Sequence, residues 1–390
     1  MNNACALPIK RILMTGEITS TIWTYMMELI KALDEYNIEV VLAAMGGLLP
    51  DEQKEEIKKL ANIKVYESNF KLEWMEKPWK DLEKAGKWLL MLEKLTKPDI
   101  IHCNSYVYGA LPWHNPVVLV GHPYVLHQLA LQADVTKEHE KYYQHVQSSL
   151  DKAASIVVPT KQLLFMLEKK FGQLSRARII RYSRNPSLFP LGKKNPFIFS
   201  SEETWNDIPS IETLNNIAPS LNWPIYIAKN SDVPGEKPNP YRNLLILDRL
   251  SSKLARSWLT SAAIYVLPSG NESFGFSVLE AALSGCVLVL GDTPSLRELW
   301  GDCAVYVARN DEEGLKTTLK FLITSRDFCQ NIAARSHKQA LEYIPKNMAK
   351  SYISLYQELN IARYQKSTLT IKQDTPQKYC VTQQATCLSA

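Results

Sequence analysis

The chain has 390 residues, enough for two domains, and its 46% hydrophobic and 22% charged residues are ordinary for a soluble globular protein. Its 45 Lys and Arg and 40 Asp and Glu give a net charge of +5, which indicates no nucleic-acid partner but allows a weak peripheral contact with anionic lipid at the inner face of a membrane. The sequence shows no signal peptide, no apolar run of about 18 residues and no Cys/His spacing typical of zinc. These features together predict a cytoplasmic protein without a metal.

The first half of the chain alternates short apolar runs with amphipathic helical patterns. Helices are predicted at 23–36, 79–95 and 160–172, where apolar residues recur at helical spacing. Predicted strands are nearly continuous in apolar residues, as is typical of parallel strands buried on both faces, and they lie at 10–16, 38–46, 97–104, 116–122 and 154–160. His102, inside one of them, is expected to be an ordinary core histidine. This alternation predicts a doubly wound α/β domain.

A stretch rich in Pro, Ser and Lys at 183–196 interrupts the alternation and is interpreted as an interdomain hinge. The pattern then resumes, with predicted strands at 196–200, 224–230, 243–248, 262–269 and 286–292. The predicted fold class is α/β, with two Rossmann-like doubly wound domains at 1–190 and 191–345 that face a cleft. A helix is predicted at 346–365, and the aperiodic, Thr/Gln-rich tail at 366–390 is predicted to be disordered.

The stretch PSGNESFGFSVLE, which begins at Pro268, follows a predicted strand and enters a helix near Phe276. Ligands of open α/β sheets bind beyond the carboxyl ends of the strands, where the unpaired N–H groups of a helix N-terminus suit a phosphate. Gly275 lets the backbone approach a ligand closely, Glu280 can accept hydrogen bonds from a ribose, and Glu272 can accept them from a sugar. This order fits a nucleotide sugar better than the alternative, in which Glu280 is a solvated residue on the helix surface.

The segment ESFGFSVLE resembles the signature of the retaining glycosyltransferases of the two-domain GT-B fold, family 4. The likeness extends over roughly residues 10 to 345, through segments such as DIIHCNSYVYGALPW and LEAALSGCVLVLGDTPSLRELWGDCAVYV. It implies transfer of a sugar from a nucleotide-diphosphate sugar to an acceptor hydroxyl with retention, in polysaccharide or glycoconjugate synthesis. It also implies that no metal or other cofactor is needed and that the last helix returns to the N-terminal domain. The acceptor stays open between a sugar, a lipid-linked sugar and a small molecule.

The resemblance assigns roles residue by residue. Glu272 and His122 would form the catalytic centre, with Glu272 near the anomeric carbon of the donor sugar and His122 on the acceptor side. Glu280 would bind the ribose, and the backbone N–H groups of Phe276 and Ser277 would bind the donor phosphate. Position alone leaves His122 equally open to a structural role, as a residue at a strand end that bonds to the backbone.

The chain departs from the family pattern around the donor diphosphate. The departures are Ser20 and Thr21 where the family has two glycines, Glu202 and Glu203 where it has Gly-Arg, Pro209 near its lysine, and Lys229 and Asp248 where it has single glycines. Lys229, Arg181 and Arg184 are the cations that could replace the lost diphosphate contacts. Two interpretations stay open: an active glycosyltransferase with a rearranged phosphate site, and a non-catalytic relative that keeps the fold to bind a sugar or a partner.

Overall fold

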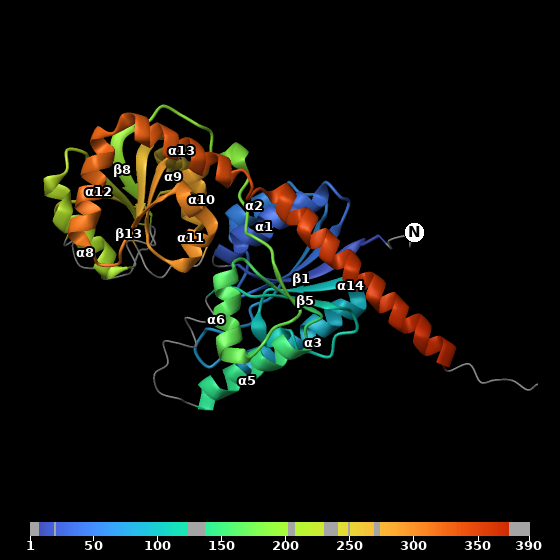
Figure 1. Ribbon diagram of the computed structural model, residues 1–390. Helices are drawn as coiled ribbons and strands as arrows, with labels where there is room; N and C mark the ends of the chain where they lie inside the picture. Colours follow the sequence, from blue (N-terminus) through green and yellow to red (C-terminus); the bar gives the residue numbers. More distant parts are fainter. Residues whose placement is uncertain are drawn as a thin grey trace, which may run out of the picture.

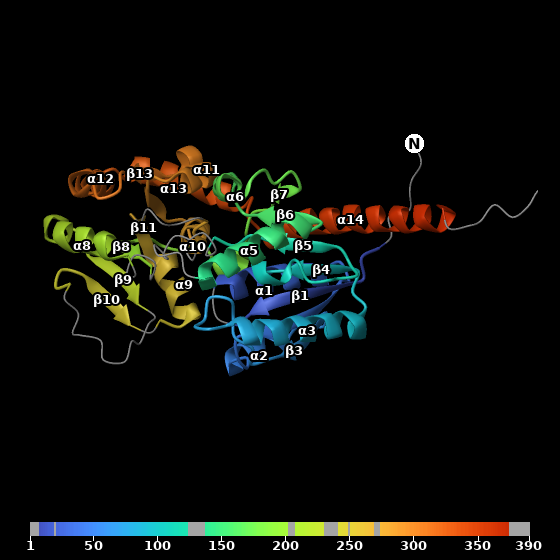
Figure 2. The same ribbon diagram turned by 90° about the horizontal axis from the view of Figure 1, so that it is seen from below.

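The computed structural model describes residues 8–18, 21–123, 137–201, 207–229, 241–248, 250–268 and 274–373. The chain forms two α/β domains that lie beside each other in both Figure 1 and Figure 2. Each domain is built on one parallel sheet with helices on both faces, because its strands are apolar on both sides and need cover from two layers. The predicted fold class is confirmed.

The N-terminal sheet has seven parallel strands in the order β3-β2-β1-β4-β5-β6-β7. The strands are β1 (Arg11–Glu17), β2 (Glu39–Met45), β3 (Ile63–Glu67), β4 (Ile100–Cys103), β5 (Val117–Val120), β6 (Ser155–Val158) and β7 (Ala177–Ile179). Around it lie the helices α1 (Thr21–Asp34), α2 (Asp51–Ile57), α3 (Trp79–Thr96), α5 (Lys137–Lys152) and α6 (Lys161–Phe171), and the 3-10 turn η1 (Tyr106–Tyr108). The strand order reverses between β1 and β4, which makes their carboxyl ends the topological switch point where ligands of such sheets bind.

The C-terminal sheet has six parallel strands in the order β10-β9-β8-β11-β12-β13, with its switch point between β8 and β11. The strands are β8 (Asn195–Ser200), β9 (Ile225–Lys229), β10 (Leu245–Asp248), β11 (Ala262–Leu267), β12 (Val287–Gly291) and β13 (Val305–Val307). The helices are α8 (Ile208–Ile217), α9 (Ser252–Ser261), α10 (Phe276–Leu283), α11 (Pro294–Trp300), α12 (Glu312–Thr324) and α13 (Arg326–Ala340).

Three strands were missed in the sequence: β3, β7 and β13. All three lie at sheet edges, and most of their residues are only partly buried. By contrast, every residue of the central strands β5, β6 and β12 is buried. An edge strand is covered less completely, so its sequence lacks the continuous apolar run that reveals a central strand.

Helix α14 (Pro345–Gln373) leaves the C-terminal domain and runs back along the N-terminal domain beside α1 (Figure 1). Tyr25 of α1 donates a hydrogen bond to Tyr352 at 2.6 Å, and the Tyr356 hydroxyl lies 2.6 Å from Nδ1 of His102, so His102 is a core histidine as predicted. These buried contacts fix the last helix to the N-terminal domain.

The length of α14 corrects one predicted boundary. The tail was predicted to begin at 366, but the helix continues through residues 366–373. Ser and Thr weaken a helix without stopping it, Lys, Leu and Gln favour it, and the first proline beyond Pro345 is Pro376. Residues 374–390 lie outside the described residues. Within the described part of the chain, no helix is both long and apolar enough to cross a lipid bilayer.

Candidate functional site

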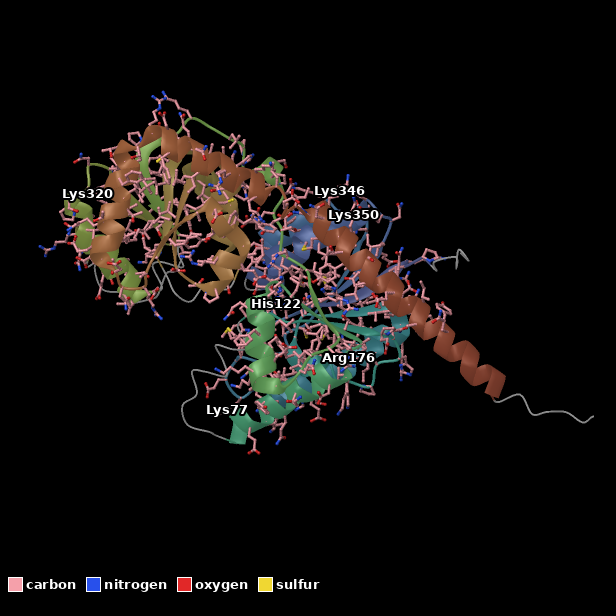
Figure 3. All side chains as sticks on the ribbon, viewed as in Figure 1. Lys77, His122, Arg176, Lys320, Lys346 and Lys350 are labelled. Carbon is pink, nitrogen blue, oxygen red and sulfur yellow. The ribbon has the colours of Figure 1, made fainter. Side chains whose placement is uncertain are left out.

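His122 stands at the carboxyl edge of the N-terminal sheet, directly after β5 and Gly121. A Cβ atom on Gly121 would lie 2.8 Å from both the Tyr106 hydroxyl and Cγ1 of Val158, so only glycine lets the chain pass here. The imidazole of His122 is buried, with 2% of the residue exposed, and Figure 3 shows it where the two domains meet.

Both ring nitrogens of His122 are engaged. Asn104, directly after β4, donates from its side-chain amide to the carbonyl oxygen of Thr15, so its Oδ1 is left to face Nε2 of His122 at 3.2 Å. Nε2 therefore carries the proton, and Nδ1 accepts a hydrogen bond from the Tyr182 hydroxyl at 2.6 Å. Burial lowers the pKa of His122 to about 3. The ring is neutral at pH 7 and is held in one tautomer.

Tyr182, in the segment that joins β7 to the hinge, links the two domains at this point. Its ring stacks on Phe276 of α10, with centroids 5.3 Å apart and an interplanar angle of 5°, and contacts Phe274 at 4.9 Å. On its other side it meets Tyr25 of α1 at 5.0 Å. Sequence reasoning missed Tyr182 because it belongs to no motif and its partners are distant in the chain.

The N-terminal turn of α10 combines a left-handed glycine with a buried serine hydroxyl. Gly275 adopts φ 73° and ψ 74°, a left-handed conformation that side chains disfavour. The first N–H groups of any helix lack intrahelical partners. Ser277 is 9% exposed, and its hydroxyl is buried without a hydrogen-bond partner in the described part of the chain. This turn follows β11, at the switch point of the C-terminal sheet.

Glu280, one turn into α10, is bound by a residue of the hinge. Its Oε1 lies 2.7 Å from Nε of Arg184, in an ion pair whose angles do not make an aligned hydrogen bond. The same guanidinium donates to Glu28 of α1 at 2.8 Å. Burial raises the pKa of Glu28, although Arg184 acts against this shift. Arg184 thus joins two acids from different domains and does not stand free for a phosphate.

Lys229 and Asp248, two departures from the family pattern, are neighbours in space. They occupy paired positions at the ends of the parallel strands β9 and β10, and Lys229 Nζ lies 4.0 Å from a carboxylate oxygen of Asp248. Asp248 is 69% exposed, so solvent weakens this pair. The two replacements of glycine therefore partly offset each other in charge.

A second bridge between the domains is centred on Glu298 of α11. Its carboxylate accepts hydrogen bonds from the backbone N–H groups of Lys161 and Gln162 at 2.9 and 3.1 Å, which caps the N-terminus of α6. It also pairs with Arg181 at 2.7 Å. Arg181, like Arg184, is used to hold the two domains together.

Four of the predicted site residues lie outside the described residues: Ser20, Glu202, Glu203 and Glu272. Pro209 is in the first turn of α8, where proline is well tolerated because a helix N-terminus needs no partner for that nitrogen. Among the described residues, no group of His, Cys, Asp and Glu side chains could hold a metal ion.

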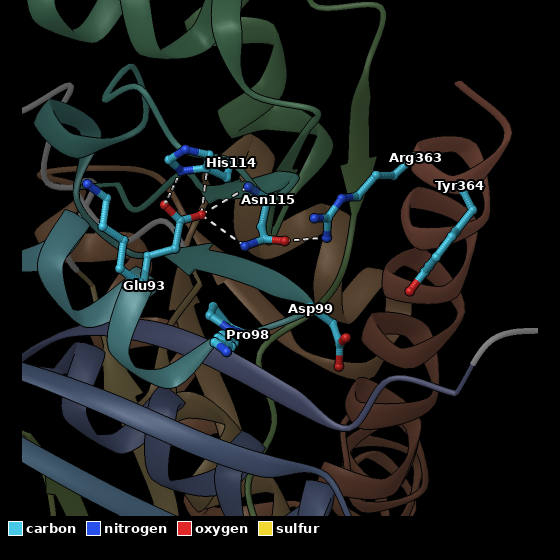
Figure 4. A pocket seen from close by; sticks show the side chains of 9 residues that line it. Glu93, Pro98, Asp99, His114, Asn115, Arg363 and Tyr364 are labelled. Atoms are coloured by element: carbon cyan, nitrogen blue, oxygen red, sulfur yellow. Dashed lines mark hydrogen bonds and ion pairs between the residues drawn. The ribbon is translucent and has the colours of Figure 1, made fainter. Parts of the chain in front are cut away.

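A cavity of about 400 Å³ lies at the edge of the N-terminal sheet opposite to His122, where α3 ends and β5 begins (Figure 4). Buried Glu93 accepts hydrogen bonds from the backbone N–H groups of His114 and Asn115 at 2.9 and 3.0 Å. Arg363 of α14 donates to the Asn115 side chain. These contacts hold the middle of α14, around Arg363, against the edge of the sheet opposite to His122.

Comparison with known proteins agrees with this geometry. The model of the family described as Glycosyltransferase Family 4 matches residues 22–182, and that of Glycosyl transferases group 1 matches residues 239–339. The 2-deoxystreptamine N-acetyl-D-glucosaminyltransferase of Niallia circulans is 23% identical over 110 residues, which are 27% of this chain and 28% of that relative. The aligned part is thus well under two thirds of the relative's length.

Solved structures share the fold over most of the chain. Sucrose-phosphate synthase from Thermosynechococcus elongatus matches with a TM-score of 0.74 at 14% identity, over 90% of this chain and 100% of that one. Anabaena Alr3699/HepE in complex with UDP-glucose matches with a TM-score of 0.68 at 13% identity, again over 90% and 100%. The two family models and this shared architecture place the chain among the family 4-like glycosyltransferases of the two-domain GT-B fold.

Proposed function

We propose that the chain is a retaining hexosyltransferase that moves a sugar from a nucleotide-diphosphate sugar to an acceptor hydroxyl, in polysaccharide or glycoconjugate synthesis. The bond from the anomeric carbon to the diphosphate breaks, a bond to the acceptor oxygen forms, and the nucleoside diphosphate leaves. The observation that carries the proposal is the first turn of α10, where left-handed Gly275 and the buried, unpartnered hydroxyl of Ser277 stand at a switch point.

The donor would lie along α10. The N–H groups of Phe276 and Ser277 would stabilise charge on the departing diphosphate, as fixed dipoles do when they are aimed at developing charge. Glu280 would accept from the ribose hydroxyls beside its contact with Arg184, since a carboxylate can accept several hydrogen bonds. The name of Alr3699/HepE records that this structural neighbour binds UDP-glucose, which supports a UDP-sugar as the first donor to test.

His122 would act on the acceptor side as a positioning residue and not as a proton carrier. Its ring is neutral and bonded at both nitrogens, so a proton transfer would have to break the contact with Tyr182 or Asn104. Glu272 and Lys229 keep their proposed roles near the donor sugar and the diphosphate. No metal or other cofactor is proposed.

Calorimetric titration with UDP tests the donor site. We expect the native chain to bind UDP and Glu280→Gln to bind it roughly tenfold to a hundredfold more weakly, because a hydrogen bond to a charged group contributes about 1.5–3 kcal/mol. Glu212→Gln, at an exposed position of α8 in the same domain, is the matched control. Equal UDP affinity in the two variants would remove Glu280 from the site.

Turnover separates the enzyme from a binding protein. UDP-glucose and other UDP-sugars are offered with a panel of sugars and amino sugars, UDP release is followed, and proton NMR reads the anomeric configuration of the product. Release with retained configuration supports the proposal. UDP-sugar binding without any release would favour the non-catalytic alternative, and an inverted product would overturn retention.

A further inference from the structure

Arg184 lies where two segments of the chain pass between the domains. One segment joins β7 to β8 and contains Arg184, and the other joins α13 to α14 and contains Tyr343. The backbone N–H of Arg184 donates to the carbonyl oxygen of Tyr343 at 3.1 Å. Its guanidinium carbon lies 5.2 Å from the ring centre of Phe189, which is buried. The arginine is therefore held through both its backbone and its side chain.

The guanidinium of Arg184 uses separate nitrogens for acids of the two domains. Its Nε lies 2.7 Å from Oε1 of Glu280 on α10, and its Nη1 donates to Oε1 of Glu28 on α1 at 2.8 Å. The side chains of Arg184, Glu28 and Glu280 are 13%, 5% and 23% exposed. Salt screens charges at such shielded positions much less than it screens charges on the surface. One arginine thus connects Glu280 of the C-terminal domain to the N-terminal domain.

Glu28 holds this arginine from the side of the N-terminal domain. Helix α1, which carries Glu28, packs on β1 and on α14. Burial raises the pKa of Glu28, and the charge of Arg184 is the largest influence in the opposite direction, followed by the backbone of Asn185. The segment that joins β7 to β8 therefore supplies the groups that compensate most for the burial of this acid.

We propose that Arg184 is a positioning residue for the donor: it orients the carboxylate of Glu280 toward the ribose, and Glu28 holds Arg184 in place. This inference rests on the proposed function, because it takes Glu280 as the acid that binds the ribose. A glutamate side chain has several rotatable bonds, and ordering them during binding costs affinity. A carboxylate that the fold already orders avoids this cost. Donor binding in the C-terminal domain therefore depends on a residue of the N-terminal domain.

A guanidinium suits this geometry better than an ammonium does. It presents N–H groups along the edges of a rigid plane, whereas the ammonium of lysine is a compact charge at the end of a flexible chain. Arg184→Lys keeps the positive charge but loses the two separate donors that reach Glu28 and Glu280. The substitution therefore distinguishes the orientation of Glu280 from the simple presence of a cation.

Calorimetric titration of the full chain with UDP and with 2′,3′-dideoxy-UDP tests this role. The ratio of the two affinities reports the contact with the ribose hydroxyls, and a partial loss of folded protein lowers both affinities alike. We expect the native chain to prefer UDP by about tenfold or more. This ratio should fall by about threefold or more in Arg184→Lys and in Glu28→Met, because Glu280 is then less well ordered.

Arg178→Lys and Glu358→Met are the matched controls. They alter a more exposed pair of the same two residue types, and the ratio of the native chain should persist in both. With Glu280→Gln already present, Glu28→Met should leave the remaining ratio unchanged, because both substitutions act through one carboxylate. A native ratio in either Arg184→Lys or Glu28→Met, or a further fall when Glu28→Met is added to Glu280→Gln, would overturn the positioning role.

The same titrations separate this inference from the proposed function. A preference for UDP that depends on Glu280 but not on Arg184 and Glu28 would refute only the positioning role. A native chain that binds UDP and 2′,3′-dideoxy-UDP equally, or binds neither, would remove Glu280 from the donor site and refute the inference together with that assignment.

Discussion

Three buried ionisable side chains should give the fold a stability maximum near pH 6.5. Burial lowers the pKa of His102 and of His122 from 6.5 to about 3 and raises the pKa of Glu17 from 4.5 to about 8. Each group returns to its ordinary pKa on unfolding. As the pH falls below 6.5, the unfolded histidines take up protons that the folded ones do not, and stability is lost. As the pH rises from 4.5 to 8, the unfolded Glu17 has released its proton while the folded one retains it, and stability is again lost.

The magnitudes follow from proton linkage, in which one proton difference changes stability by about 1.4 kcal/mol per pH unit. Between pH 4.5 and 6.5 the two histidines outweigh Glu17, and the free energy of unfolding should rise by about 1.4 kcal/mol per unit. Between pH 6.5 and 8 Glu17 is the only one of these three groups that changes the balance, and its contribution lowers the free energy of unfolding by about 2 kcal/mol in all. These changes are large beside the roughly 5–15 kcal/mol that stabilises a typical domain.

Urea unfolding at half-unit steps from pH 5 to pH 8 measures this profile. Glu17→Gln removes the titrating group and should abolish the decline above pH 6.5, while Glu212→Gln, at an exposed position, should retain it. The reasoning is refuted if the native chain is equally or more stable at pH 8 than at pH 6.5, or if Glu17→Gln shows the same decline.

Three further substitutions test the junction of the two domains by thermal and urea unfolding. Tyr182→Phe removes the hydroxyl that donates to Nδ1 of buried His122 and should destabilise the fold by about 1–3 kcal/mol. The control Tyr364→Phe, at a residue that is 50% exposed, should change stability little. Equal effects of the two substitutions would contradict the contact. Arg184→Met removes the cation shared by Glu28 and Glu280 and should destabilise the fold by about 3–5 kcal/mol. Arg178→Met, which breaks a more exposed ion pair, should destabilise the fold much less. A loss below about 1 kcal/mol in Arg184→Met would show that its ion pairs are dispensable. Gly121→Ala places a methyl group 2.8 Å from Tyr106 and Val158 and should destabilise by about 1–3 kcal/mol; an unchanged midpoint would show that this strand end relaxes freely.

The sequence by itself determined the architecture. Central parallel strands must be apolar on both faces, so their continuous apolar runs, alternating with amphipathic helices, were enough to predict two doubly wound domains. It also located α10 and its glycine, because the strand, loop and helix of that motif are adjacent in the chain. The local sequence pattern did not reveal the partly exposed edge strands β3, β7 and β13. It also placed the end of the last helix before residues 366–373, which continue the helix.

Only the tertiary structure decided which residues of the candidate site contact one another. Tyr182 with His122, Arg184 with Glu280 and Glu28, and Glu298 with the start of α6 join residues that are far apart in sequence, and no local periodicity encodes such pairs. The same holds for Glu17, at the end of β1, and Glu73, in the loop after β3, which line one cavity although β1 and β3 do not pair with each other. Burial is set by the packed fold as well, so the shifts that make His122 neutral and keep a proton on Glu17 arise from the surroundings that the fold builds around ordinary side chains.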